Sequence, residues 1–120
     1  MTANRTLAEA LQALEGEQLS SVEFVQDYVQ LRFDGPCLNV YTPHRITSGE
    51  STISWGEPGY CDALCKLIGR IVRKAQISEG ENLSFSFDGP FVWSMSLRDS
   101  DYHGPEALYY VDGAGQSWVE

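Results

Sequence analysis

The chain has 120 residues, and its seventeen Asp and Glu outnumber eight Lys and Arg, which gives a formal net charge of −9 and a pI near 4.5. This length suits one domain, and we expect residues 1–120 to form a single one. A hydrophobic fraction of 42% is that of a folded protein and excludes general disorder. The acidic balance argues against nucleic acid or an anionic membrane as a partner, because both attract basic surfaces.

The sequence also predicts a location in the cytoplasm. No apolar run approaches the roughly 20 residues that are needed to span a bilayer. Residues 1–15 contain no continuous apolar stretch of the kind that a secretion signal needs. The three cysteines are an odd number, which is more typical of reduced thiols than of a disulfide framework.

Residues 6–15 predict a short helix. Thr6 and Glu9 have the spacing of a capping box, in which a hydroxyl and a carboxylate bond free backbone N–H groups at the helix start. Three leucines then share one helix face, and Gly16 can end the helix in a left-handed conformation. A helix this short must pack against another part of the chain.

Beyond this helix the hydrophobic period changes to two, which is typical of β-strands. We expect strands over residues 19–25 and 29–33. Asp34 and Gly35 then favour a tight hairpin turn, from which the chain returns through residues 37–42. This part of the chain therefore predicts an antiparallel sheet.

The middle of the chain predicts a loop followed by the longest helix. Residues 43–58 are rich in Gly, Ser, Thr and Pro and indicate a long loop with a short strand around 52–55. Residues 60–76 predict a long helix with an apolar stripe at helical spacing, formed by Leu64, Leu67, Ile68, Ile71, Val72 and Ala75. Because four of the basic residues fall in this segment, the negative charge is concentrated elsewhere.

The last third of the chain again alternates apolar and polar residues. We expect strands over 83–87 and 91–97, an acidic polar loop over 98–106, and a final hairpin formed by 107–111 and 116–119. The expected fold class is therefore α+β, with an antiparallel, hairpin-built sheet, the long helix packed across one face and the short N-terminal helix beside it.

The tetrapeptide Phe-Asp-Gly-Pro occurs twice, at residues 33–36 and 87–90. An internal duplication explains this recurrence. So does the general preference of hairpin turns for Asp-Gly, which two unrelated hairpins can satisfy independently. The sequence leaves both explanations open.

Two groups of residues have spacings that occur in metal or catalytic sites. Cys61 and Cys65 lie four residues apart, but a zinc site requires two further ligands, and we expect both to be small core residues. Asp99, Asp101 and His103 alternate, and in an extended segment their side chains share one side, as metal ligands or an acid–base pair do. The sequence contains none of the common enzymatic motifs and implies no cofactor.

Aromatic residues are frequent in a chain of this size. Most lie at alternating strand positions, where core packing explains them. Trp55 instead falls in the Gly/Ser/Pro-rich segment, which makes it a candidate for partner recognition, because Trp is enriched in binding hot spots.

Several short segments follow one another in a recognisable order. They are Gly16-x-x-Leu19, the strand 29–33, the expected long helix, Ser96-Leu97-x-Asp99 and the run 104–107. In this order the chain resembles a broad group of small acidic bacterial proteins of unknown function, some of which are presumed to be immunity proteins of toxin systems. The resemblance spans most of the chain and brings no catalytic residues with it. It implies an intracellular protein that neutralises a partner.

The sequence thus favours a non-enzymatic protein-binding module, immunity-like, whose acidic surface attracts a basic protein. The expected partner-binding residues are Trp55, Asp99, Asp101 and Glu106. The alternative is a small-ligand or metal-binding domain, or an enzyme, that uses the loop of Asp99, Asp101 and His103. A third option is a homodimer formed through an unpaired strand edge.

Overall fold

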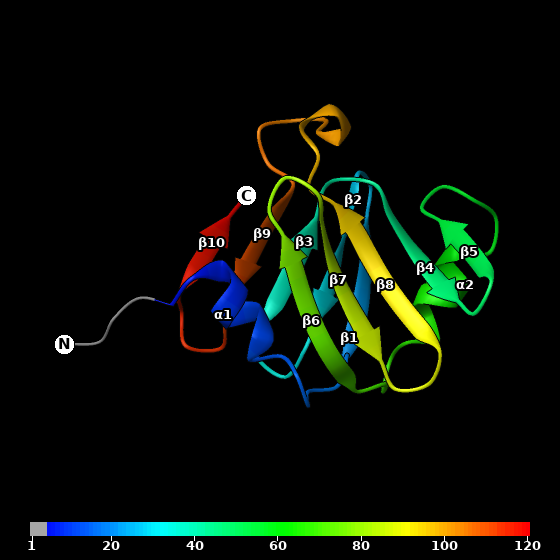
Figure 1. Cartoon of the computed structure of the whole chain (residues 1–120), viewed down its shortest axis with the longest axis horizontal. Coiled ribbons are helices and arrows are strands. Elements are labelled where there is room, and N and C mark those ends of the chain that lie inside the picture. The colour runs from blue at the N-terminus through cyan, green and yellow to red at the C-terminus, as the bar shows by residue number, and fades with distance from the viewer. Residues whose placement is uncertain (1–4) are drawn as a thin grey trace.

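A computed structural model describes residues 5–120, so residues 1–4, part of the stretch considered for secretion, lie outside it. The described chain forms two facing antiparallel sheets of five strands each, with two short helices (Figure 1). None of the helices in residues 5–120 is long and apolar enough to cross a membrane.

In chain order, the elements are α1 Leu7–Gln12, β1 Ser21–Val25, β2 Tyr28–Arg32, β3 Cys37–Val40, β4 His44–Ser48, β5 Ser51–Ser54, α2 Tyr60–Cys65, β6 Val72–Ser78, β7 Asn82–Phe87, β8 Phe91–Ser96, a 3-10 turn Asp99–Asp101, β9 Leu108–Val111 and β10 Ser117–Val119. One sheet has the strand order β1-β2-β3-β9-β10 and the other β5-β4-β8-β7-β6. The structure is therefore mostly β, and the expected α+β fold with one long helix is wrong.

The long helix predicted over 60–76 is replaced by α2, a turn and β6. Gly69, with a φ of 90°, ends the turn, and β6 carries a bulge between Val72 and Lys74. The bulge adds one residue, so the buried side chains of Val72 and Ala75 lie three positions apart instead of two. This spacing imitates that of a helix face, which explains the wrong prediction.

The loop predicted over 43–58 is also wrong for most of its length, because it contains β4 and β5. β4 is an interior strand that pairs with both β5 and β8. Its inward side chains are His44 and Ile46, and its outward positions are polar, so it contributes only one aliphatic residue to the core. That pattern is too weak to distinguish a strand from a polar loop.

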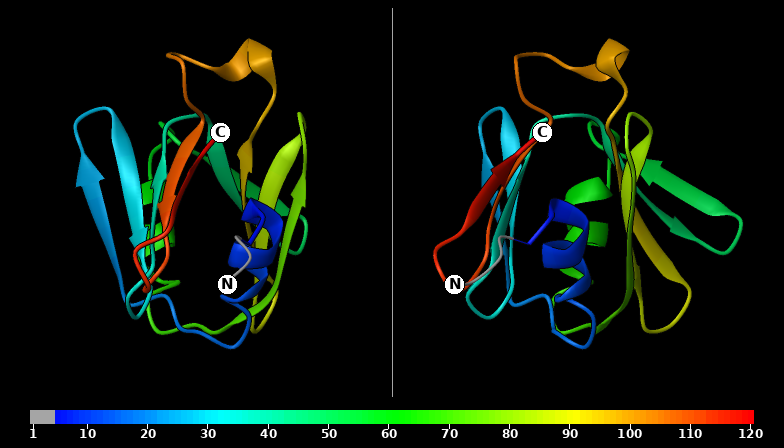
Figure 2. Two further views of the ribbon diagram at one scale, coloured as in Figure 1. Left: turned by 90° about the vertical axis from the view of Figure 1, so that its left-hand side faces the viewer. Right: turned by 60° about the vertical axis from the view of Figure 1, so that its left-hand side comes forward.

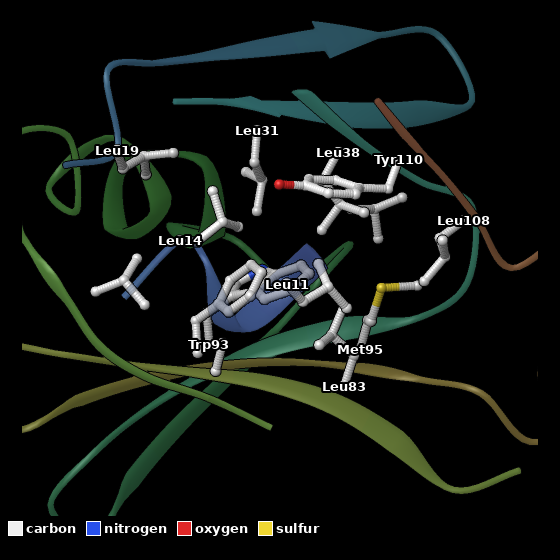
Figure 3. Close-up of a cluster of buried hydrophobic side chains, with 14 of the residues drawn as sticks. Leu11, Leu14, Leu19, Leu31, Leu38, Leu83, Trp93, Met95, Leu108 and Tyr110 are labelled. Carbon is white, nitrogen blue, oxygen red and sulfur yellow. The ribbon is translucent and has the colours of Figure 1, made fainter. Parts of the chain in front are cut away.

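The other strand and hairpin predictions are confirmed with small shifts of boundary, and the capping box of Thr6 and Glu9 is present. Side chains from both sheets and from α1 meet in one buried cluster, among them Leu11, Leu38 and Trp93 (Figure 3). Both helices lie between the sheets, where α1 packs against β6 and α2 packs against β4 and β1 (Figure 2). They supply the apolar surface that fills the space between the sheets.

The chain contains the same arrangement of elements twice. A helix followed by five strands runs from α1 to β5 and again from α2 to β10. In each half the first three strands pair in sequence, and the last two join the sheet of the other half. Thus β9 and β10 extend the sheet beside β3, and β4 and β5 extend the other sheet beside β8. The topology has an approximate twofold symmetry in which the two halves exchange their last hairpins.

Backbone hydrogen bonds at the junction of the halves follow this symmetry. The N–H of Gly16 donates to the carbonyl of Val72 at 2.8 Å, and the N–H of Gly69 donates to the carbonyl of Leu19 at 2.7 Å. A second reciprocal pair runs from Val72 to Glu17 and from Leu19 to Arg70. Gly16 therefore corresponds to Gly69, and Leu19 to Val72.

The sequence supports the same correspondence. The residues Ala10, Leu11, Leu14 and Gly16 recur as Ala63, Leu64, Leu67 and Gly69. The two Phe-Asp-Gly-Pro turns connect β2 to β3 and β7 to β8, which are equivalent hairpins. Of the two explanations for the repeated tetrapeptide, the structure favours internal duplication.

We expect Gly16→Ala and Gly69→Ala to destabilise the protein by similar amounts, about 1 to 2 kcal/mol each. Both glycines have positive φ, 94° and 90°, and neither would bring a Cβ within 4 Å of another part of the chain, so backbone strain is the only cost. Urea unfolding measures the change. Gly104→Ala, at an equally open position without positive φ, should change stability little, and a loss as large as that at Gly16 would contradict this explanation.

Candidate functional site

The candidate site lies at the end of the sandwich where residues 98–106 cross from β8 to β9 (Figure 1). The equivalent connection in the other half, from β3 to β4, is only residues 41–43. The crossing loop is therefore an addition to the second half, and it projects beyond both sheets (Figure 2). It borders two separate pockets, one on each sheet.

The first, which we call the acidic aromatic pocket, has a volume of about 700 Å³. Its lining comes from the β1–β2 turn, the end of β3, the crossing loop and Trp55. The rings of Tyr28 and Tyr41 meet edge to face at 5.1 Å, and the Tyr41 hydroxyl accepts a hydrogen bond from Asn39 Nδ2 at 3.2 Å. Its ionisable and aromatic lining residues are Asp27, Tyr28, Tyr41, Trp55, His103 and Glu106, with no Lys or Arg among the described residues that line it.

The second, which we call the serine pocket, has a volume of about 560 Å³ and lies on the outer face of the other sheet. Its floor consists of residues that alternate with the buried side chains of β4 and β8. Most of its lining side chains carry a hydroxyl, an amide or a charge. They include Arg45, Asn82, Ser94, Ser96, Arg98 and Asp101. Trp55 is the residue that lines both pockets.

The two pockets occupy equivalent places in the duplicated fold. Tyr28 and Tyr41 lie next to the paired residues Val29 and Val40 at one end of the β2–β3 ladder. Asn82 and Ser96 are paired at the same end of the β7–β8 ladder, next to Leu83 and Met95. The same position therefore has two tyrosines in one half and an amide and a hydroxyl in the other.

A buried polar network lies behind Trp55. The Tyr60 hydroxyl is 2.5 Å from His44 Nδ1 and accepts a hydrogen bond from Trp93 Nε1 at 3.2 Å. The Tyr60 oxygen can accept from the indole N–H and still share a hydrogen bond with His44 Nδ1, so one hydroxyl joins the two rings. The His44 ring also stacks against Trp55 with a centroid distance of 4.9 Å.

Burial determines the protonation of this network. His44 is 3% exposed, and burial lowers its pKa from 6.5 to about 4, so the ring is neutral at physiological pH. Burial also raises the pKa of the Tyr60 hydroxyl far above 10.0, which the hydrogen bond from Trp93 only partly offsets. Both groups are held in their neutral forms.

The residues predicted from the sequence lie around the two pockets. Glu106 is half-buried in the acidic aromatic pocket, and Trp55 is half-buried between both pockets. Asp101 lines the serine pocket and accepts a hydrogen bond from Ser96 Oγ at 2.5 Å. Asp99 is exposed on the 3-10 turn and lines neither pocket.

The alternative site of Asp99, Asp101 and His103 does not assemble. Residues 99–101 form a 3-10 turn instead of an extended segment, so their side chains do not share one side. Asp101 lines the serine pocket, whereas His103 lines the acidic aromatic pocket. Within residues 5–120, no group of three or more His, Cys, Asp or Glu side chains is arranged to hold a metal ion.

The cysteine prediction is wrong in its structural part. Cys61 and Cys65 were expected in the core, but both are exposed, and Cys37 is half-buried. All three are free thiols. The two helix cysteines lie on the outer side of α2, whose buried side chains are Tyr60 and Leu64.

Sequence reasoning missed several residues that line the site, notably Asp27, Tyr28, Tyr41, His44 and Arg45. Each lies at a strand end or turn, and only the pairing of β2 with β3 and of β4 with β8 brings them together. The cross-strand pair of tyrosines was accessible from the predicted hairpin, because Tyr28 and Tyr41 are equally distant from its Asp-Gly turn. The role of His44 was hidden by the assignment of residues 43–58 to a loop.

Comparisons of this chain with protein-family models, with curated proteins and with solved structures find no match. Its function must therefore be inferred from the geometry described above.

We expect His44 to make the protein less stable as the pH falls from 6.5 to 4. The unfolded chain takes up a proton near pH 6.5 and the folded chain only near pH 4, so the full stability is present above pH 6.5 and is lost as the pH falls. The loss approaches about 3 kcal/mol below pH 4. Urea unfolding at several pH values measures this loss of stability. Carboxylates also contribute to the pH dependence of stability in the same range.

The variant His44→Leu separates the histidine from the carboxylates. It should show a shallower fall of stability between pH 6.5 and 4 than the wild type. His103→Leu, which replaces an exposed histidine, is the matched control and should keep the wild-type slope. Equal slopes for wild type and His44→Leu would contradict the prediction.

Proposed function

We propose that the protein is a non-enzymatic binding module of the cytoplasm, of the immunity type that the sequence resemblance implies, and that it holds a basic protein partner. The observation that carries this proposal is the acidic aromatic pocket, which combines three aromatic rings with two carboxylates and has no Lys or Arg in its described lining. Its partner would insert a Lys or Arg side chain.

The chemistry of the lining suits such a cation. A guanidinium or ammonium group is attracted to aromatic ring faces, and here Tyr28 and Tyr41 supply two rings at one wall. Asp27 and Glu106 supply carboxylates that can pair with the same group. A volume of about 700 Å³ is that of an ordinary binding pocket and exceeds the needs of one side chain, so neighbouring residues of the partner also fit.

The remaining acidic residues act at longer range. Asp99 is exposed on the crossing loop beside the pocket, and the whole chain carries a net charge of −9. Such a field accelerates encounter with a basic partner and disfavours acidic ones. Asp99 should therefore affect the association rate more than the dissociation rate, whereas Glu106 should affect both.

The test uses an end-blocked fluorescein-labelled peptide of alternating Gly and Arg, with a Gly and Glu peptide as its negative counterpart. We expect fluorescence anisotropy to show binding of the basic peptide only, weakening as salt rises. Glu106→Gln and Asp27→Asn should each weaken binding about 3- to 10-fold. Tyr41→Leu should weaken it without changing the net charge.

The matched control is Glu50→Gln, which removes the same charge from the exposed β4–β5 turn, away from the pocket. It should change the affinity less than twofold. If Glu50→Gln weakens binding as much as Glu106→Gln, the attraction is a property of the net charge, and the pocket assignment is overturned. No binding of the basic peptide at low salt would overturn the proposal itself.

A further inference from the structure

The strand β1 presents an open edge. It pairs with β2 through a hairpin with a two-residue turn, in which Val25 is paired with Tyr28. Hydrogen-bonded pairs alternate from such a turn, so every second residue of β1, beginning at Val25, bonds to β2. The N–H and C=O groups of Val22 and Phe24 therefore point away from β2, and no strand in residues 5–120 pairs with that side of β1.

The equivalent edge in the other half, that of β6, is closed. Glu15 Oε2 accepts a hydrogen bond from the N–H of Ala75 at 3.0 Å and so satisfies a donor at this edge. Arg73 and Lys74 are exposed on the same strand, and charged side chains on an edge strand disfavour the addition of a further strand.

The groups that close β6 are missing at β1. In the correspondence defined by the reciprocal backbone hydrogen bonds, Glu15 corresponds to Ile68, and Ala75 corresponds to Val22. An isoleucine side chain cannot accept the N–H of Val22. The two cations of β6 correspond to two uncharged serines. The edge of β1 is therefore free to bond a further strand.

The surface beside this edge is apolar. Phe24 and Ile68 are large hydrophobic residues with 40% and 42% of their surface exposed. Cys61 and Cys65 are exposed on the outer side of α2, which packs against β1. A strand that adds to β1 covers part of this surface with its inward side chains, so apolar residues at alternate positions suit it.

The outer face of the same edge selects the charge of the added strand. Glu23 is exposed there, and its ion pair with Arg32 is long, at 3.6 Å. A residue of the added strand lies opposite Glu23, where Lys or Arg is favoured. A second copy of β1 is unsuitable, because the antiparallel register that joins Val22 to Phe24 sets Glu23 opposite Glu23, between two chains of net charge −9.

The open edge leads directly to the acidic aromatic pocket. β1 continues into Gln26 and Asp27, which line that pocket. The ring of Phe24 stacks against Trp55, another lining residue, at a centroid distance of 6.5 Å. Because all ladders of both sheets are antiparallel, we expect the added strand to begin at the pocket and to run towards Ser21.

We propose that the partner binds by adding one of its own segments to β1 as an extra antiparallel strand. The segment alternates apolar residues, which cover Phe24 and Ile68, with Lys or Arg, one of which lies opposite Glu23. A basic residue at its N-terminal end enters the acidic aromatic pocket. This inference rests on the proposed function for the basic character of the partner, but the edge is a separate contact.

The first experiment measures binding of the end-blocked, fluorescein-labelled peptide Arg-Gly-Val-Lys-Val-Lys by fluorescence anisotropy and compares two N-methylated forms. In an antiparallel strand on β1, the valines lie opposite Val22 and Phe24 and turn their N–H groups towards them, whereas the lysine N–H groups face solvent. Methylating both valine nitrogens should weaken binding about 10-fold or more. Methylating both lysine nitrogens is the matched control and should weaken it less than about threefold.

The second experiment closes the edge by mutation. Ile68→Glu installs the residue of the equivalent position and should weaken binding about 10-fold, although it adds a negative charge that attracts a basic peptide. Val119→Glu, the matched control, adds the same charge at an exposed residue of β10, the opposite edge strand of this sheet, and should change the affinity less than about twofold. Hydrogen exchange followed by NMR should show the amide protons of Val22 and Phe24 protected only when the wild type has bound the peptide.

These results distinguish the edge from the pocket. No binding of the unmethylated peptide overturns the inference, as do equal affinities of the two methylated forms or an Ile68→Glu variant that binds as tightly as the wild type. The pocket proposal then still stands on the Gly and Arg peptide. If that peptide fails but the alternating peptide binds as expected, only the pocket proposal falls. A dimer of the free protein that Ile68→Glu dissociates would assign the edge to a second copy and overturn the inference.

Discussion

The four reciprocal backbone hydrogen bonds between residues 16–19 and 69–72 are the contact on which the rest of the structure depends. They join the segment that leads into β1 to the segment that leads into β6, and so connect the two sheets at their first strands. From that junction each half builds three strands of its own sheet and then donates a hairpin to the other. Neither sheet is complete without both halves, which makes the core between them a shared product of the two repeats.

Much of this fold was predictable from the sequence, and the errors have physical causes. Strands whose inward positions are all apolar, such as those around Leu31 and Phe85, were recognised from their period of two. The strand β6 was missed because its bulge gives helical spacing, and β4 because it has a buried histidine in place of an aliphatic residue. The repeated Ala-Leu-x-x-Leu-x-Gly of the two helices carried the missing information, since it ends the second helix segment at Gly69, as it ends the first at Gly16.

The candidate site was predictable only in part, for a related reason. Trp55 and Glu106 were selected by composition, as an aromatic residue in a polar segment and an acid in a polar loop. The loop that contains Glu106 does lie beside Trp55. Tyr28 and Tyr41 could be paired from the predicted Asp-Gly hairpin, but Arg45 and His44 could not be selected, because their position depends on the pairing of β4 with β8. Only the pairing of β2 with β3, and the transfer of β4 to the other sheet, brings them to the same end of the molecule.

A comparison of equivalent positions in the two halves shows which side chains the shared fold requires. A hydrogen-bonded group buried without charge gains little over a well-packed apolar residue and costs more when its geometry is imperfect. In the other half, the three positions equivalent to His44, Tyr60 and Trp93 are leucines. The shared fold therefore does not require the hydrogen-bonded network, which needs another explanation. The same comparison separates the pockets, whose equivalent positions carry tyrosines on one sheet and an amide and a hydroxyl on the other. Duplication produced two equivalent pockets. The shared fold does not require the residues in which these pockets differ.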